Sequence, residues 1–231
     1  QAELGAVAAG GDLGAFDVAL VMTHPACADD VDDPMTHEQA RRFDAMRAAL
    51  PAAPASFANS AATLRGVDFH YDLVRPGIAL YGGRAIASGA NPMRHVATVT
   101  ARIVQLRHAV AGDRVGYGAR QTLTRASRLA VLSAGYADGY VRMAGGADGR
   151  AGGCAYLGEH AAPLVGRVSM DLIAIDVTDI PEHLSAPGAE VELIGDRFTV
   201  DDLAALCGTI GYEVLTGLGR RFVRDHVGGA G

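Results

Sequence analysis

The chain has 231 residues, of which 49% are hydrophobic and 20% are charged, as in a soluble globular protein that is long enough to bury a core. A formal net charge of −6 without a dense basic stripe argues against nucleic acid as the main partner. The sequence has no apolar run of about 18 residues, so we expect no membrane span, and its start does not resemble a signal peptide.

Strand and helix patterns alternate in the first part of the chain. The apolar run 17–22 predicts a short strand. Residues 35–50 carry Phe43, Met46 and Leu50 at helical spacing, which predicts an amphipathic helix. A second short strand and a helical turn follow, and the segment 71–83 predicts another buried strand that runs into a loop at Arg75.

Units of strand, helix and strand imply parallel strands, with ligand groups gathered where the strands end. About ninety residues cannot form a whole barrel, which takes about 250. We therefore expect residues 1–92 to be the C-terminal part of a (β/α)8 barrel of the TIM type.

Residues 93–231 predict a mainly antiparallel β domain. Val99, Ala101 and Ile103 share one face of an alternating segment, and further strand patterns occur at 128–136, 162–177 and 189–196. Thr199 with Asp202 three residues later predicts the N-terminal cap of a short helix that stops near Gly208.

Several short motifs contain side chains that are able to carry chemistry. Asn59 and Ser60 precede a helix start, where N–H groups and a hydroxyl suit a phosphate, although such residues are also typical of a plain cap. Arg75 lies beside a glycine at a strand end, where a surface ion pair is the simpler interpretation. Tyr117 lies between two glycines, and it is either part of a tight turn or a phenol held out to react.

Taken together, these motifs resemble the alanine racemase family over nearly the whole chain. The matching stretches occur in the family's order and spacing, and they are "VMTHPACAD", "ANSAAT", "VRPGIALYGG", "RVGYGA", "GYADGY", "VGRVSMDLIAIDVTD" and "GYEVL". The resemblance implies a pyridoxal 5'-phosphate enzyme that interconverts L- and D-alanine to supply peptidoglycan precursors. It also implies a head-to-tail homodimer.

The resemblance further implies a set of cofactor contacts. Ser60, the backbone around Gly77 and Ile78, and the hydroxyl of Tyr212 match positions that hold the cofactor phosphate. Arg75 matches the arginine that faces the pyridine nitrogen, and His24 matches a histidine near the ring that supports this arginine.

Tyr117 matches the family's catalytic tyrosine, which reaches into the active site of the partner subunit. Tyr136 and Met170 match residues at the substrate carboxylate, with Asp171 adjacent to them. Racemisation removes a proton from one face of the α-carbon and returns it to the other, which favours two acid–base groups on opposite sides. A tyrosine phenol acts as such a base only where neighbouring positive charge lowers its pKa.

The sequence departs from the family in one respect. All twenty of its basic residues are arginine, so it has no lysine to form a Schiff base with the cofactor or to act as the second base. We therefore expect a fragment that is inactive alone. The alternatives are a fragment of a racemase with broader amino-acid specificity and a non-catalytic remnant that binds a partner or anion.

The cysteines are uninformative about a metal or a disulfide. Cys27, Cys154 and Cys207 are far apart, odd in number and without a CxxC spacing, which indicates neither a zinc site nor a disulfide framework. A reducing, cytoplasmic setting fits this pattern best, so we expect a cytoplasmic protein.

Overall fold

The computed structural model describes residues 2–10 and 12–228. The described residues form two compact units that divide between Arg94 and His95, called unit 1 (up to Arg94) and unit 2 (from His95). The boundary lies two residues after the position expected from the change in sequence pattern.

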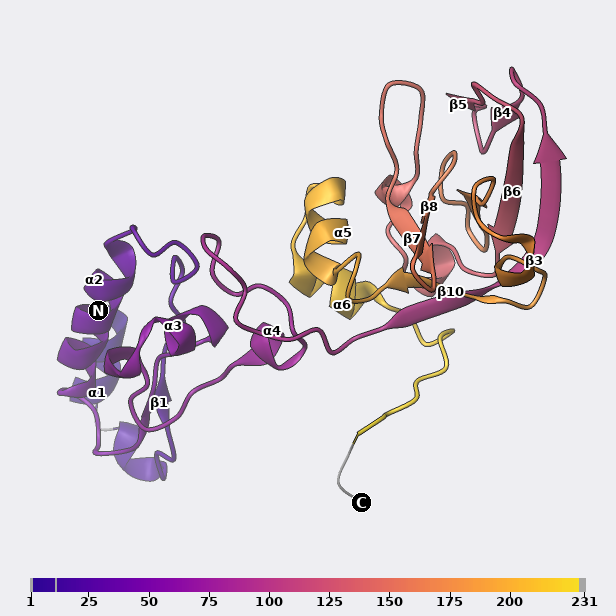
Figure 1. Cartoon of the computed structure of the whole chain (residues 1–231). Helices are drawn as coiled ribbons and strands as arrows, with labels where there is room; N and C mark the ends of the chain where they lie inside the picture. The colour runs from indigo at the N-terminus through magenta and orange to yellow at the C-terminus, as the bar shows by residue number, and fades with distance from the viewer. Residues whose placement is uncertain (1, 11, 229–231) are drawn as a thin grey trace. The chain divides into compact units, whose positions relative to one another are not determined.

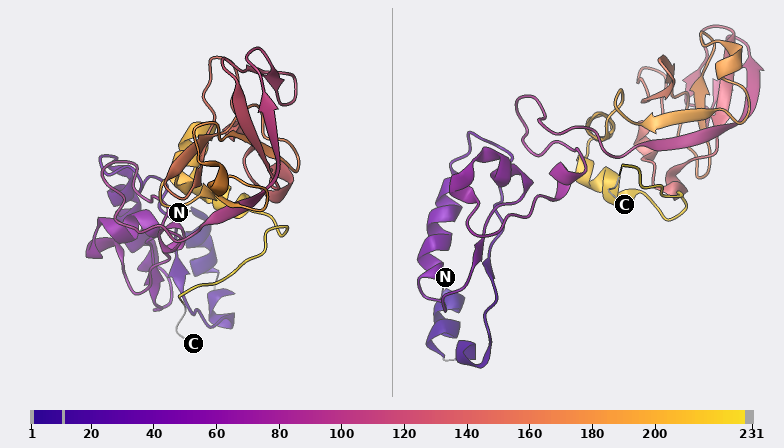
Figure 2. Two further views of the ribbon diagram at one scale, coloured as in Figure 1. Left: turned by 45° about the vertical axis from the view of Figure 1, so that its right-hand side comes forward. Right: turned by 60° about the horizontal axis from the view of Figure 1, so that its bottom comes forward.

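Unit 1 combines short helices with one pair of parallel strands (Figure 1). Its elements are α1 (Ala2–Ala9), the 3-10 helix η1 (Asp12–Ala15), β1 (Val21–Met22), α2 (Met35–Arg47), β2 (Ala55–Ser56), α3 (Ser60–Arg65), the 3-10 helix η2 (Val67–Phe69) and α4 (Gly77–Leu80). Strands β1 and β2 pair in parallel, with Val21 opposite Ala55. Helix α2 runs along one side of this strand pair (Figure 2).

Aromatic side chains form the core of unit 1. Phe43, on the face of α2 that the helical spacing predicts, is 2% exposed, and its ring lies 6.1 Å from that of Phe57 just after β2. Phe69 stacks on Phe57 at 5.9 Å, and Tyr71 meets the edge of Phe43 at 5.4 Å. Burial and a hydrogen bond with Asp44 raise the pKa of Tyr71 to about 12. Helix α2 is therefore fixed to the strand pair by rings from three segments.

Two strand predictions in unit 1 differ from the structure. Of the run 17–22, only Val21–Met22 is a strand. The segment 71–83 is not a regular strand, because its only ladder contact is a parallel bridge from Arg75 to Asn59 and it then turns into α4. Pro76 has no N–H to donate and limits strand continuation. The N–H groups of Leu73 and Arg75 still donate to carbonyls of the β2 segment, at 3.2 and 2.9 Å.

Unit 2 is built on one six-stranded antiparallel sheet with the strand order β8-β7-β10-β3-β6-β9. Its elements are β3 (Val99–Ala109), β4 (Arg114–Val115), β5 (Gln121–Thr122), β6 (Ser127–Leu132), η3 (Tyr136–Asp138), η4 (Arg142–Ala144), β7 (Cys154–Leu157), β8 (His160–Pro163), β9 (Ile173–Asp176), η5 (Glu182–Leu184), β10 (Glu190–Ile194), α5 (Val200–Cys207) and α6 (Gly211–Gly217), where η marks 3-10 helices. Strands β4 and β5 form a separate hairpin.

The two outer strands of this sheet approach each other. Leu164, directly after β8, forms an antiparallel bridge with Ile175 in β9, so the sheet is nearly closed. The predicted alternation in β3 is confirmed, because Val99, Ala101 and Ile103 are all buried in the core.

Helix α5 begins and ends as its sequence predicts. Thr199 Oγ1 accepts the N–H of Asp202, while the Asp202 carboxylate accepts the N–H of Thr199, which satisfies both ends of a capping box. Gly208 ends the helix in the left-handed conformation at φ +70°. Val200, Leu203 and Ala204 pack this helix onto the core of unit 2.

Candidate functional site

In unit 1, the predicted cofactor residues gather after the ends of the two strands. His24 follows β1 by two residues, and Ser60 follows β2 by four. Arg75 is brought to the same edge by its bridge to Asn59. Because the carboxyl ends of parallel strands meet at one edge of a sheet, side chains from separate segments come together there.

Asn59 and Ser60 are fixed by hydrogen bonds at the start of α3. Asn59 Oδ1 accepts the N–H of Ala62 at 3.0 Å, so Asn59 is the cap of this helix. Its amide nitrogen lies 3.4 Å from Nε2 of His24. Ser60 is 2% exposed, and its Oγ accepts the N–H of Ala79 at 3.3 Å. The starts of α3 and α4 are therefore joined through the Ser60 hydroxyl.

Arg75 is held by groups at the carboxyl ends of β1 and β2. One terminal nitrogen donates to the Thr23 carbonyl at 2.7 Å and to the Phe57 carbonyl at 3.4 Å. The other donates to Ser56 Oγ. The His24 ring contacts the Asn59 amide. The expectation that His24 supports Arg75 therefore stays a prediction. The planar guanidinium is oriented by three acceptors at once.

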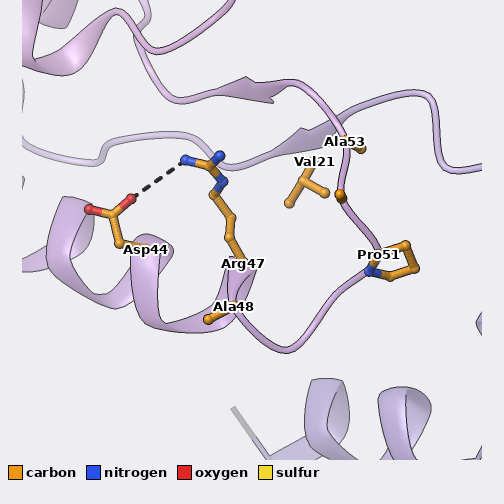
Figure 3. Close-up of a pocket in the computed structure, with 7 residues that line it drawn as sticks. Val21, Asp44, Arg47, Ala48, Pro51 and Ala53 are labelled. Carbon is orange, nitrogen blue, oxygen red and sulfur yellow. Dashed lines mark ion pairs between the residues drawn. The ribbon is translucent and has the colours of Figure 1, made fainter.

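A pocket in unit 1 lies at the opposite ends of the strands (Figure 3). It measures about 260 Å³ and is lined by Val21, which opens β1, by Ala53, which precedes β2, and by the Asp44–Arg47 ion pair of α2. None of the predicted site residues lines it. Ligands of parallel α/β units bind at the carboxyl ends of strands, so this pocket is not the candidate site.

In unit 2, Tyr117 lies at the tip of the β4–β5 hairpin, with its side chain 70% exposed. Gly116 and Gly118 on either side have φ values of +79° and +76°, which side chains rarely adopt. The N–H of Ala119 donates to the carbonyl of Gly116 at 3.0 Å and closes the turn. The motif is therefore a tight turn that leaves the phenol exposed, and the reactive role of Tyr117 stays a prediction.

The Tyr117 hairpin is packed against the loop that carries Met170. A Cβ built on Gly116 would lie 2.8 Å from the backbone nitrogen of Arg167. The Gln121 side chain accepts the N–H of Gly166 at 2.6 Å. Arg167 also supplies positive charge here, because its Nη1 lies 3.8 Å from the Cβ position of Gly118. Motifs fifty residues apart in sequence thus form one structural group.

Tyr136 and Met170 are brought together by backbone contacts. The N–H of Tyr136 donates to the Ser169 carbonyl at 3.0 Å, and the N–H of Ala137 donates to the Met170 carbonyl at 2.9 Å. A Cβ on Gly135 would lie 2.3 Å from the Met170 oxygen, so only glycine allows this approach. Both Tyr136 and Met170 are exposed, at 39% and 53%.

The sequence motifs did not single out two residues of this cluster, Arg167 and Arg221. Arg167 lies within the quoted motif "VGRVSMDLIAIDVTD", where its charge was the available signal. Arg221 forms ion pairs with both Asp138 and Asp171. No local pattern indicates these contacts, since Arg221 lies fifty residues from Asp171. Tyr212, by contrast, was predicted from the resemblance as a contact of the cofactor phosphate. It lies in the first turn of α6 and is 43% exposed, and its role stays a prediction.

Metal and membrane features are lacking in the part of the chain that the structure describes. Within residues 2–10 and 12–228, no group of three or more His, Cys, Asp or Glu side chains could hold a metal ion. No helix among the same residues is both long and apolar enough to cross a bilayer.

Comparison with known proteins gives a consistent result. The family model for the alanine racemase C-terminal domain matches residues 96–226, and that for the N-terminal domain matches residues 2–85. The alanine racemase of Rhizobium meliloti is 48% identical over 221 residues, which cover 93% of this chain and 58% of that protein. The biosynthetic alanine racemase of Agrobacterium fabrum is 46% identical over 218 residues, which cover 92% of this chain and 56% of that protein.

A solved structure matches over nearly the whole chain. The alanine racemase from Bartonella henselae, crystallised with covalently bound pyridoxal phosphate, gives a TM-score of 0.88 at 35% identity. The match covers 98% of this chain and 62% of that one. The chain thus spans somewhat more than half the length of the relatives that it matches.

Proposed function

Because this chain belongs to the alanine racemase family, we propose that it carries part of the active site of a pyridoxal-phosphate-dependent racemase that interconverts L- and D-alanine for peptidoglycan precursors. The observation that carries the proposal is the presentation of Tyr117. Its phenol is exposed on a turn that two left-handed glycines define, and the turn is packed on the loop that leads to Met170. This arrangement suits a proton-transfer group that is held beside a substrate.

In unit 1, Ser60 and the backbone of Gly77 and Ile78 fit the phosphate of the proposed cofactor. Ser60 Oγ accepts a bond from Ala79 and still carries a hydroxyl hydrogen to donate. The N–H of Ile78 lies in the first turn of α4, where a helix offers no acceptor of its own. A Cβ on Gly77 would meet nothing within 4 Å, so the space beside this backbone is open. Hydroxyl and amide donors with open space beside them suit an anion.

Arg75 would face the pyridine nitrogen of the cofactor. When bound, pyridoxal phosphate withdraws the electron pair that remains at the α-carbon after the proton leaves. A guanidinium does not readily give up a proton, so Arg75 would leave the ring nitrogen largely unprotonated. Limited withdrawal of the electron pair favours return of the proton to the α-carbon, which is racemisation, over transamination.

We assign the proton transfer on one face of the α-carbon to the hydroxyl of Tyr117. Tyr136 and Met170, with Asp171 adjacent, would orient the substrate carboxylate relative to that hydroxyl. The group on the opposite face, and the amine that anchors the cofactor, must come from outside these 231 residues, because the chain has no lysine. We therefore propose that the chain alone is inactive.

Tyr117 further supports a proposed homodimer. A base on a solvent-exposed turn becomes effective where a second surface encloses it and excludes water. We propose that a second copy of the protein provides that surface. The three cysteines are free thiols, which fits our proposal of a reducing, cytoplasmic setting.

Alanine racemisation tests the proposal directly. The chain is assayed with added pyridoxal phosphate, alone and after co-expression with a lysine-bearing N-terminal segment from a relative, each with a Tyr117→Phe control. We expect activity in the co-expressed sample alone and its loss in the Tyr117→Phe sample. Activity from the lysine-free chain alone would refute the assignment of the second base. A folded, co-expressed protein without activity would support the non-catalytic alternative, and equal rates with larger amino acids would support broader specificity.

A further inference from the structure

Three separate segments of unit 2 meet at the side chain of Arg221. Its Nε lies 3.0 Å from Asp138 Oδ1, and its Nη1 lies 2.8 Å from Asp171 Oδ1. Asp138 ends η3, which begins with Tyr136, and Asp171 directly follows Met170. Arg221 itself follows α6. One guanidinium therefore links the two segments that carry the proposed substrate contacts to the C-terminal segment.

The Asp138 carboxylate makes this link rigid. Its side chain is 9% exposed, and its second oxygen accepts the N–H of Gly135 at 2.8 Å. The Asp138 carbonyl accepts the N–H of Gly219 at 2.7 Å, which fixes the segment before Arg221. A Cβ on Gly139 would lie 2.0 Å from the Gly217 carbonyl oxygen, so the end of α6 lies directly against η3.

We propose that Arg221 is a positioning residue that sets the placement of Tyr136 relative to Met170 and Asp171. The consequence for catalysis rests on the proposed function, but the positioning itself does not. Arginine suits the role because its fork donates to two carboxylates in different directions, which the point charge of a lysine cannot do. The hydrogen bond to Asp171 and the charge of Asp138 also raise the pKa of the Arg221 guanidinium.

Arg221 also balances charge at the site. The two carboxylates would place two negative charges near the position proposed for the substrate carboxylate, and the guanidinium offsets one of them. Without Arg221, the buried Asp138 loses its partner charge, and the unpaired Asp171 carboxylate is free to move or to repel an anionic substrate. Both effects weaken substrate binding.

Amide hydrogen exchange on the 231-residue chain tests the positioning independently of activity. The two amides that join the segments are those of Tyr136 and Ala137. In Arg221→Gln we expect both to lose protection, while the amide of Val177, which donates to Arg128 in the sheet, keeps it. Arg224→Gln is the matched control, because the Arg224 side chain lies in the same C-terminal segment and donates to the backbone carbonyls of Leu218 and Gly219. Unchanged protection in folded Arg221→Gln would overturn the proposal.

Asp171→Asn provides a second test if Arg221→Gln does not fold. This change removes the exposed ion pair and keeps the buried pair between Arg221 and Asp138. We expect Ala137 to lose protection, since its acceptor belongs to the adjacent Met170, and unchanged protection would again overturn the proposal.

Kinetic measurements on the chain co-expressed with the lysine-bearing N-terminal segment then separate the positioning role of Arg221 from its effect on catalysis. We expect Arg221→Gln to lower kcat/KM for alanine by about 10²-fold, mainly through KM, with partial recovery in Arg221→Lys. If exchange responds as predicted and the wild-type protein shows no racemisation, the positioning stands and the proposed function fails. If kcat/KM is unchanged in Arg221→Gln, the catalytic consequence is refuted.

Discussion

Gly116 lies against the backbone of Arg167, so closely that a Cβ on Gly116 would be 2.8 Å from the Arg167 nitrogen. This contact fixes the hairpin that presents Tyr117 onto the loop that leads to Met170. The placement of the exposed phenol thus depends on the backbone packing of the turn that carries it.

Replacing Gly116 with alanine should disturb the turn. Gly116→Ala combines a left-handed φ of +79° with the steric overlap, and we expect it to lower the free energy of unfolding by about 1–3 kcal/mol and to reduce racemisation. Gly149→Ala is the matched control, because Gly149 has a similar φ of +75° and open space around it. Urea denaturation measures both variants. Equal losses would mean that the contact with Arg167 contributes nothing.

Arg75→Lys should weaken unit 1. A lysine cannot reach the acceptors from Thr23, Phe57 and Ser56 together, so we expect the free energy of unfolding to fall by about 1–3 kcal/mol. Arg41→Lys, at a position 75% exposed on α2, should stay within about 0.5 kcal/mol. Thermal unfolding with and without pyridoxal phosphate would show whether Arg75→Lys also reduces stabilisation by the cofactor. A stability equal to that of wild type would contradict the anchoring described for Arg75.

Asp148 should contribute stability that depends on pH. Its carboxylate accepts hydrogen bonds from the N–H and hydroxyl of Thr122, which lower the pKa of Asp148 below its ordinary value of about 3.9. A lowered folded-state pKa stabilises the protein above the unfolded value, and this stability is lost as pH falls through the folded value. Asp148→Asn should therefore be less stable than wild type at pH 7, and the difference should shrink below about pH 4.

Urea midpoints of wild type and Asp148→Asn at pH 7 and pH 3 check this expectation. A difference that stays constant or grows at pH 3 would show that the Asp148 charge does not matter.

Thr199→Ala should affect stability without affecting the site. It removes the hydroxyl that accepts the N–H of Asp202, and loss of such a cap costs about 0.5–2 kcal/mol. Thr199→Ser keeps the hydroxyl and should behave as wild type. Chemical denaturation measures the loss, and a change in KM for alanine in Thr199→Ala would contradict our view that α5 only supports the core.

Local patterns predicted the features that depend on neighbours in sequence. The alternation of Val99, Ala101 and Ile103 and the capping box of Thr199 were both confirmed, because each depends on residues a few positions apart. The prediction of a buried strand over residues 71–83, around Arg75, was wrong, because an apolar run of that length suits a strand or a short helix equally well. Tertiary contacts with β2 decided its form.

Contacts between distant segments could not be predicted from single motifs. The ion pairs of Arg221 with Asp138 and Asp171 join positions 83 and 50 residues away, where no spacing rule applies. The motif resemblance placed Tyr117, Tyr136 and Met170 in one site, and the structure adds the backbone contacts that link their loops in unit 2. Their chemical roles stay predictions.

Exchange of the α-proton with solvent deuterium tests the central claim, that the Tyr117 hydroxyl transfers the proton on one face. The lysine-supplied protein and its Tyr117→Phe variant are incubated with L- or D-alanine in D₂O, and proton NMR with a chiral assay follows exchange and inversion. We predict that Tyr117→Phe loses inversion by about 10²–10⁴-fold and still exchanges one enantiomer with retention. Inversion at the wild-type rate in Tyr117→Phe would contradict the account.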